Sequence, residues 1–307
     1  MDKSVDGFCV DSVEEGVKLR THGITKPILV LGYTLPALYV VAAKNNIIVT
    51  LSSRESLAAW SKAKPKPQFH LKMDTGMHRQ GFQIRELKAV VEKTQKYTMG
   101  VYTHFAMAKN RDDKVFTQKQ FFIFQEACAI LEKLGFKNLM RHASATGGTL
   151  LGKEFHADLV RVGIGLYGIW PSAELESQLC KKIKLVPALG LHSVISEIKT
   201  ITKGEGVGYD LTERVTRDTK IAVIPVGYWH GIPRAASSLG FVWVGKHKAK
   251  IIGRVSMDMI VVDVTHFPCK VGTGVHIVPL ELARAIDASP YEVITRINPL
   301  IHKVIRR

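Results

Sequence analysis

The chain has 307 residues, of which 46% are hydrophobic, enough for one large barrel or two ordinary domains with a buried core. Its formal net charge is +16, but Lys and Arg occur in ones and twos without interleaved aromatic residues, so no nucleic-acid partner is expected. The longest uncharged apolar stretch, 27–43, is too short to span a membrane, and no secretory signal precedes it, so we expect a cytoplasmic protein without a membrane partner.

The first half of the chain alternates short β-branched runs with longer amphipathic stretches, which is typical of parallel βα units. Strands are expected at 7–10, 27–32, 69–74, 99–106, 138–144 and 159–168, and helices at 12–23, 85–96 and 117–135. Polar residues end several of these strands, as in a (β/α) barrel, whose chemistry lies at the carboxyl ends of its strands. These residues are Lys72, Asp74, His104, His142, Ser144 and Arg161.

After Pro171 the helical periodicity fades, and short apolar runs punctuated by Gly and Pro predict an antiparallel β domain. Strand-like runs occupy 188–202, 220–228, 240–245, 248–264 and 274–279, and a helix is expected at 281–297. We therefore predict a barrel at 1–184 and a β domain at 185–307.

The four cysteines, at positions 9, 128, 180 and 269, form no C-x-x-C pair and have no histidines at metal-ligand spacing. The sequence therefore predicts neither a structural metal nor a disulfide framework.

Seven motifs follow one another along the chain in the order that one known family has them. They are LKMDTGMHRQGF, THFA, RHASATGGTLL, RVGIGLYG, GEGVGYD, IPVGYWHG with GRVSMDMIVVDV, and SPYEVITRI. The chain thus resembles alanine racemases, fold-type III enzymes that use pyridoxal phosphate, over essentially its whole length. The resemblance implies a TIM-like barrel followed by an antiparallel β domain. It also implies a homodimeric isomerase (EC 5.1.1.1) with active sites shared between subunits, interconverting L- and D-alanine for peptidoglycan.

Three residues match the part of the family's site that faces the pyridine ring of the cofactor, one by contact and two by orienting that residue. Arg161, which opens RVGIGLYG, matches the arginine at the pyridine nitrogen, where a permanently protonated guanidinium makes the ring a weaker electron sink than a carboxylate would. His104 and His142 resemble the histidines that orient this arginine.

Four residues match the family's phosphate cradle, in which backbone N–H groups and hydroxyls surround a dianion. They are Thr146, Gly163, Ile164 and Tyr291. The sequence departs from the family here, because Ala145-Thr146 stands where Asn-Ser is common.

Tyr209, in GEGVGYD, resembles the tyrosine that moves the Cα proton on one face of the bound amino acid, in a reaction that needs two bases on opposite faces. The resemblance assigns the second base to the lysine that carries the cofactor. That lysine should follow the first barrel strand in a motif like VKANAYGHG, and no such motif occurs in the 307 residues. We therefore expect a first βα unit to be missing and the chain as written to be inactive.

Substrate contacts are matched by Arg79 and the backbone of Met257, since a guanidinium suits a carboxylate. Lys72 matches a lysine that is carbamylated in many family members and supports that arginine. Asp258 is expected beside Tyr291. Tyr228 resembles a tyrosine on the substrate side, although the nearby His230 stands where the family has Asp.

Three alternatives stay open at this point. A racemase of other or broader amino-acid specificity needs only a few changes in the pocket. A non-catalytic pyridoxal-phosphate carrier would explain the absent lysine, although it would not need the β domain. A basic nucleic-acid-binding barrel would explain the charge.

Overall fold

The computed structural model describes residues 4–90 and 94–305, and the chain divides into two compact units. Unit 1 comprises Met1–Gly165 and Trp170–Lys184, and unit 2 comprises Leu166–Ile169 and Leu185–Arg307. Within these described residues, none of the helices combines the length and the apolar character that crossing a membrane requires.

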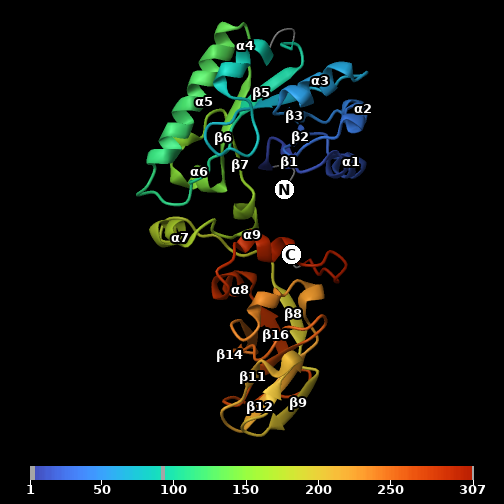
Figure 1. Ribbon diagram of the computed structural model, residues 1–307, viewed down its shortest axis with the longest axis vertical. Coiled ribbons are helices and arrows are strands. Elements are labelled where there is room, and N and C mark those ends of the chain that lie inside the picture. The colour runs from blue at the N-terminus through green and yellow to red at the C-terminus, as the bar shows by residue number, and fades with distance from the viewer. Residues whose placement is uncertain (1–3, 91–93, 306–307) are drawn as a thin grey trace. The chain divides into compact units, whose positions relative to one another are not determined.

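Unit 1 is built on parallel strands that neighbour one another in chain order (Figure 1). The pair β1–β2 and the five-strand sheet β3–β7 are joined by backbone hydrogen bonds from Val30 N to Ile48 O and from Ile48 N to Ile28 O, both 2.9 Å long. This is the βα order of a barrel wall, as the sequence predicted. The strands are β1 Phe8–Val10, β2 Ile28–Val30, β3 Val49–Leu51, β4 Phe69–Lys72, β5 Thr98–Tyr102, β6 Met140–Ala145 and β7 Leu159–Arg161.

Some helices of unit 1 begin at capping side chains. The Ser12 hydroxyl accepts from Glu15 N at the start of α1, and Ser53 forms a capping box with Ser56 at the start of α3. The long α5 lies along β5 and β6 in Figure 1. The helices are α1 Val13–Thr21, α2 Tyr39–Lys44, α3 Arg54–Lys62, α4 Leu87–Val90, α5 Val115–Lys133, α6 Thr146–Leu151 and α7 Ala173–Leu179, with 3-10 turns η2 Pro36–Leu38, η3 Ile84–Glu86, η4 Lys153–Phe155 and η5 Ile164–Tyr167.

Several predicted elements of unit 1 are shorter than expected; for example, the strands at 27–32 and 99–106 end at Val30 and Tyr102. The strand at 159–168 ends at Arg161 and is followed by the turn η5, where Gly163 N and Gly165 N donate to Thr146 Oγ1; Gly168, with a φ of +70°, follows the turn. The helix at 85–96 consists of η3 and α4 up to Val90, and its part at 91–93 lies outside the described residues.

Unit 2 consists of antiparallel sheets, as predicted. Their strand orders are β15-β12-β9, β14-β13-β16-β8 and β10-β11. The strands are β8 Leu191–Val194, β9 Glu197–Ile201, β10 Gly206–Val207, β11 Glu213–Arg214, β12 Thr219–Ile224, β13 Phe241–Val244, β14 His247–Lys250, β15 Ile260–Asp263 and β16 Gly274–Ile277. The turns η6 Tyr209–Leu211, η7 Tyr228–His230 and η8 Arg234–Ala236 connect some of them.

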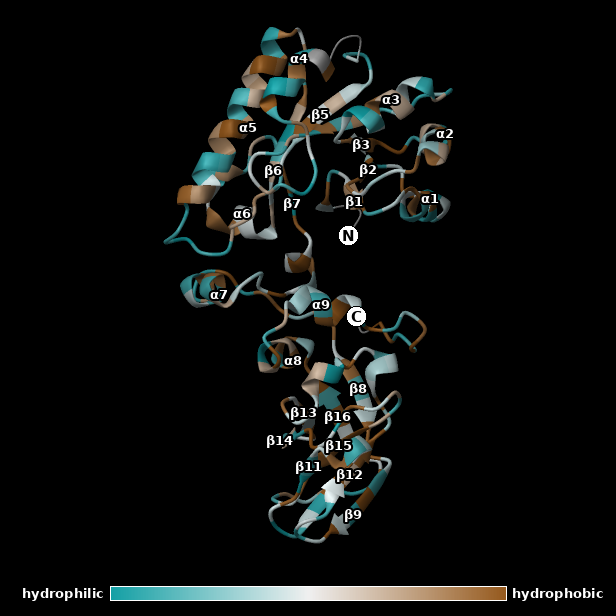
Figure 2. Cartoon of the chain, viewed as in Figure 1, coloured by the Kyte–Doolittle hydropathy of each residue, from teal (hydrophilic) through white to brown (hydrophobic). Residues whose placement is uncertain are grey.

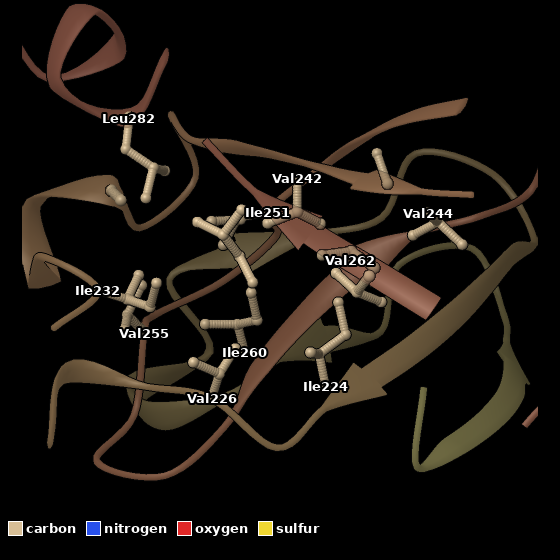
Figure 3. Packing of buried hydrophobic residues seen from close by; sticks show 14 of the residues in the cluster. Ile224, Val226, Ile232, Val242, Val244, Ile251, Val255, Ile260, Val262 and Leu282 are labelled. Carbon is tan, nitrogen blue, oxygen red and sulfur yellow. The ribbon is translucent and has the colours of Figure 1, made fainter. Parts of the chain in front are cut away.

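The core of unit 2 is apolar. Buried Val and Ile side chains such as Ile224, Val242 and Ile260 point toward one another from β12, β13 and β15 (Figure 3). Figure 2 shows brown, hydrophobic residues alternating with teal ones along the strands, the pattern of sheets with one buried face.

The predicted helix at 281–297 is wrong as a single element. It is two helices, α8 Pro279–Ala285 and α9 Pro290–Thr295. Asp287 between them has a φ of +51°, outside the helical region, and Pro290 lacks the N–H that would continue α8.

Candidate functional site

A cavity of about 480 Å³ lies at the carboxyl ends of the strands of unit 1. It is lined by residues that end β4, β5 and β7 or directly follow β1, β2 and β5, together with the loop after β4. These residues are Asp11, Leu31, Gly32, Tyr33, Lys72, Arg79, Gln80, Tyr102, His104 and Arg161. Four of the residues singled out from the sequence, Lys72, Arg79, His104 and Arg161, therefore share one cavity. Three of them are cationic side chains, which favours an anionic ligand.

Arg161 is buried at the end of β7 and is held entirely by neutral acceptors among the described residues. Its Nη1 lies 2.6 Å from His142 Nδ1, and its Nη2 donates to the carbonyl oxygens of Thr103 at 2.8 Å and Ala143 at 2.9 Å. His104 Nδ1 lies 3.4 Å from the same Nη2. No carboxylate of the described residues forms an ion pair with it, so the guanidinium is an uncompensated buried cation.

The histidines around Arg161 are held neutral. Burial, assisted by the positive charge of Arg161, lowers the pKa of His104 to about 4 and that of His142 well below its ordinary value. A neutral ring can accept a hydrogen bond from the guanidinium, whereas a protonated ring cannot.

Two residues of this network were missed by the sequence reasoning. The Tyr102 ring stacks on His142 with centroids 4.8 Å apart, lies 5.1 Å from the Arg161 guanidinium carbon and has its hydroxyl 3.0 Å from Thr50 Oγ1. His70 Nδ1 lies 2.8 Å from His142 Nε2. A signal was available for His70, because it precedes Lys72 by two residues on one strand and so faces the same side.

Lys72 is also buried, and its Nζ donates to Gln80 Oε1 at 3.0 Å. Burial and the guanidinium groups of Arg79 and Arg161 lower the pKa of Lys72 to about 8. Asp74 opposes this shift only weakly, because its carboxylate accepts from Gly76 N and His78 N instead. The neutral, nucleophilic amine of Lys72 is therefore more populated near neutral pH than that of an ordinary lysine, although the cation still predominates.

A second polar cluster surrounds Thr146, the first residue of α6. Its Oγ1 accepts from Gly163 N at 3.0 Å and from Gly165 N at 3.3 Å, so the two glycine-rich turns meet at this hydroxyl. A Cβ at Gly165 would lie 2.9 Å from Thr146 Cγ2, which explains the glycine there. The structure thus brings Thr146, Gly163 and Ile164 into one corner of unit 1.

The remaining residues singled out from the sequence, Tyr209, Tyr228, Met257, Asp258 and Tyr291, lie in unit 2 and are exposed. Tyr209 is 69% exposed and begins η6 directly after Gly208, whose φ is +69°.

The loops that carry Tyr228 and Met257 pack together within unit 2. Tyr228 N donates to Ser256 O, and Trp229 N donates to Met257 O, both at 3.0 Å. A Cβ at Gly227 would lie 2.4 Å from Met257 O, so this approach requires glycine. Across the described ranges, no group of three or more His, Cys, Asp or Glu is placed to hold a metal ion.

Family models match almost the whole chain. Residues 1–171 match the N-terminal domain of alanine racemase, and residues 188–305 match its C-terminal domain. The chain belongs to the alanine racemase family. Among similar alanine racemases, that of Leptospira interrogans is 34% identical over 99% of this chain and 83% of its own length. That of Halothermothrix orenii is 36% identical over 93% of this chain and 79% of its own length.

Solved alanine racemases have the same fold. The enzyme from D-cycloserine-producing Streptomyces lavendulae superposes with a TM-score of 0.88 at 30% identity, covering 97% of this chain and 82% of that one. The Bacillus anthracis enzyme with bound L-Ala-P superposes with a TM-score of 0.85 at 28% identity, covering 96% of this chain and 86% of that one. The resemblance to alanine racemases and the fold inferred from it are therefore confirmed.

Proposed function

We propose that this chain carries the active-site residues of a pyridoxal-phosphate-dependent isomerase that interconverts L- and D-alanine, apart from the lysine that attaches the cofactor. Family membership supports the reaction, and the relative with bound L-Ala-P supports an alanine-shaped substrate. The observation that carries the proposal is Arg161, a buried cation held by neutral histidines and carbonyl oxygens at one cavity with Lys72 and Arg79. Such an arrangement costs folding free energy, and a bound ligand that accepts from Arg161 would offset part of that cost.

The residues fit the cofactor. Arg161 would face the pyridine nitrogen, and Thr146, Gly163, Ile164 and Tyr291 would hold the phosphate. The Thr146 hydroxyl, which accepts from Gly163 N and Gly165 N in this structure, keeps its own proton to donate to a dianion, and these backbone N–H groups lie beside it. When bound, pyridoxal phosphate withdraws electrons from the Cα of the attached amino acid and so makes its proton transferable.

The chain's own residues would bind the substrate and move the proton. Arg79 and the backbone of Met257 would bind the carboxylate, with Tyr228 on the substrate side.

The lowered pKa of Lys72 favours reaction of its amine with carbon dioxide, which gives a carbamate and releases a proton. The resulting anion would orient Arg79. Asp258 would support Tyr291.

Tyr209 would exchange the Cα proton on one face of the amino acid. Its high exposure suits a residue that serves the active site of a second subunit, so we propose a homodimer with shared sites. The physiological role would be to supply D-alanine for peptidoglycan in the cytoplasm.

Exchange of the Cα proton in D2O, followed by proton NMR of alanine, tests this function in a version of the protein that carries the cofactor-lysine motif ahead of the 307 residues and is supplied with pyridoxal phosphate. We expect Tyr209→Phe to reduce the exchange on one face by about 10²- to 10⁴-fold, the usual contribution of a general base, while the cofactor still binds. Tyr167→Phe, a second exposed tyrosine, is the control. Full exchange in Tyr209→Phe would assign Tyr209 to packing. A panel of other amino acids in the same assay tests a broader specificity.

None of the lysines within the 307 residues stands in the motif that the family uses to attach the cofactor. We propose that these residues alone hold pyridoxal phosphate weakly, without a covalent bond, and do not racemise alanine. Borohydride reduction followed by peptide mapping tests this. A reduced pyridoxyl group on Lys72 or Lys44 would contradict it.

A further inference from the structure

We propose that His70 is a positioning residue for Arg161, acting through His142 in a buried relay that Gly100 makes possible. The relay follows from the hydrogen bonds of unit 1. Its link to catalysis rests on the proposed function, in which Arg161 faces the cofactor.

The direction of each hydrogen bond follows from the guanidinium. Arg161 has only donors, so His142 Nδ1, 2.6 Å from Nη1, must be the acceptor. A neutral His142 then carries its proton on Nε2 and donates it to His70 Nδ1, 2.8 Å away. His70 in turn carries its own proton on Nε2. The tautomers of both rings are thereby determined by one permanent cation.

Both rings are neutral in the folded chain. Burial, assisted by the charge of Arg161, lowers the pKa of His70 to about 4 and that of His142 well below its ordinary value. Their burial leaves no water to replace a missing partner, because His70 is 6% exposed and His142 is 1% exposed.

Gly100 is the reason that His70 reaches His142. His70 lies on β4 and His142 on β6, so β5 runs between them, and Gly100 of β5 is the register partner of His70. A Cβ at Gly100 would lie 2.6 Å from His70 Cε1 and 2.8 Å from His70 Nδ1. Only a residue without a side chain leaves this space to the imidazole ring.

Without His70, the buried Nε2–H of His142 would lack its acceptor. The alternative His142 tautomer, protonated on Nδ1, would then compete, and it would present an N–H to the N–H of Arg161. The guanidinium would lose one of the acceptors that fix its plane. Tyr102, stacked on His142, holds the ring in place but cannot select the tautomer.

The first test uses the 307-residue chain without cofactor. Long-range proton–nitrogen NMR at neutral pH, with ¹⁵N-labelled histidine, reports which nitrogen of each ring carries the proton. We expect both His70 and His142 to be protonated on Nε2 alone, with assignments from His70→Asn and His142→Asn. A His142 ring protonated on Nδ1 would overturn the relay.

The second test compares two substitutions of His70. His70→Asn keeps an acceptor close to the position of Nδ1, whereas His70→Phe keeps a ring of similar size and removes the acceptor. We expect His70→Phe to shift the His142 tautomer and to weaken binding of pyridoxal phosphate, measured by its visible absorbance, about tenfold, the loss expected for one hydrogen bond to a charged network. His70→Asn should stay within about twofold of the unmodified chain.

His192→Phe, the same chemical change at an exposed site of unit 2, is the matched control and should alter neither readout. Equal cofactor binding and an unchanged His142 tautomer in His70→Phe would contradict the proposal. If neither the unmodified chain nor its variants bind pyridoxal phosphate, the proposed non-covalent binding by these residues fails, whereas the tautomer of His142 still tests the relay.

Discussion

The two units bury different kinds of side chain. Unit 1 buries several ionisable groups, namely His70, Lys72, His142 and Arg161, together with many hydroxyls. In unit 2 the buried residues that the structure describes are apolar apart from Thr219, and its core consists mainly of Val, Ile and Ala. Burial of apolar surface stabilises a fold, whereas burial of a polar or charged group costs free energy unless it is hydrogen-bonded.

The groups suited to binding a ligand are therefore buried mainly in unit 1, whereas unit 2 is stabilised by an ordinary apolar core. Unit 1 accepts an uncompensated cation and neutral histidines at the carboxyl ends of its strands, where a ligand can use them. Unit 2 presents Tyr209, Tyr228 and Met257 on loops of a sheet with an ordinary apolar core. The stability of unit 1 should therefore depend on pH and on hydrogen-bond partners, and that of unit 2 on packing.

The largest expected effect is a loss of stability in unit 1 at acid pH. The folded-state pKa of His70 and His104 is lowered to about 4, whereas the rings titrate near 6.5 in an unfolded chain. The unfolded state therefore binds more protons between these values. The stabilising contribution is full above pH 6.5 and declines as pH falls toward 4, by about 1.4 kcal/mol per pH unit for each histidine.

Hydrogen exchange of peptides from β4 to β6, measured between pH 7 and pH 4.5 and corrected for intrinsic rates, checks this. His70→Asn removes one of the titrating rings, so stability should decline with falling pH less steeply, by about 1.4 kcal/mol per pH unit. His302→Asn, at an exposed position, is the control. Peptides of β12 and β15 should depend less on pH, although burial also lowers the pKa of His276. An equal pH dependence of hydrogen exchange in the two units would contradict the proposed difference between them.

The next effect tests the packing of unit 2. Ile260 is 1% exposed within the core of Figure 3, so Ile260→Ala should lower the free energy of unfolding by about 2–5 kcal/mol, through lost burial and the cavity left behind. Urea unfolding measures it. Val271→Ala, at a site 59% exposed, should change the same quantity by less than about 0.5 kcal/mol. A small effect of Ile260→Ala would mean that this core does not stabilise unit 2.

The smallest effect concerns a single hydroxyl in unit 1. Thr50 Oγ1 donates to Val30 O at 2.7 Å and lies 3.0 Å from the Tyr102 hydroxyl. Thr50→Val keeps the shape but removes both bonds, so it should cost about 1–2 kcal/mol in unfolding free energy. Thr50→Ser retains the hydroxyl and should recover most of that loss. If Thr50→Val were neutral, hydrogen bonding would not be what maintains the interior of unit 1.

The sequence by itself was sufficient for the class of both units. Alternating βα runs and strand-end polar residues predicted the parallel strands of unit 1, because hydrophobic periodicity is a local property of the chain. The same reasoning failed where one residue interrupts a pattern, as at Asp287 within the expected helix at 281–297. It also named Arg161, His104 and His142, since each stands in a recognisable motif at a strand end.

Tertiary structure alone decided which of these groups meet and in what protonation state. His70 and His142 are 72 residues apart and lie on strands separated by β5, so no local pattern couples them. Their contact depends on the strand register and on the missing side chain of Gly100. Their neutrality depends on burial beside Arg161, and burial is set by the whole fold, because the cost of a charge is determined by everything that replaces water around it.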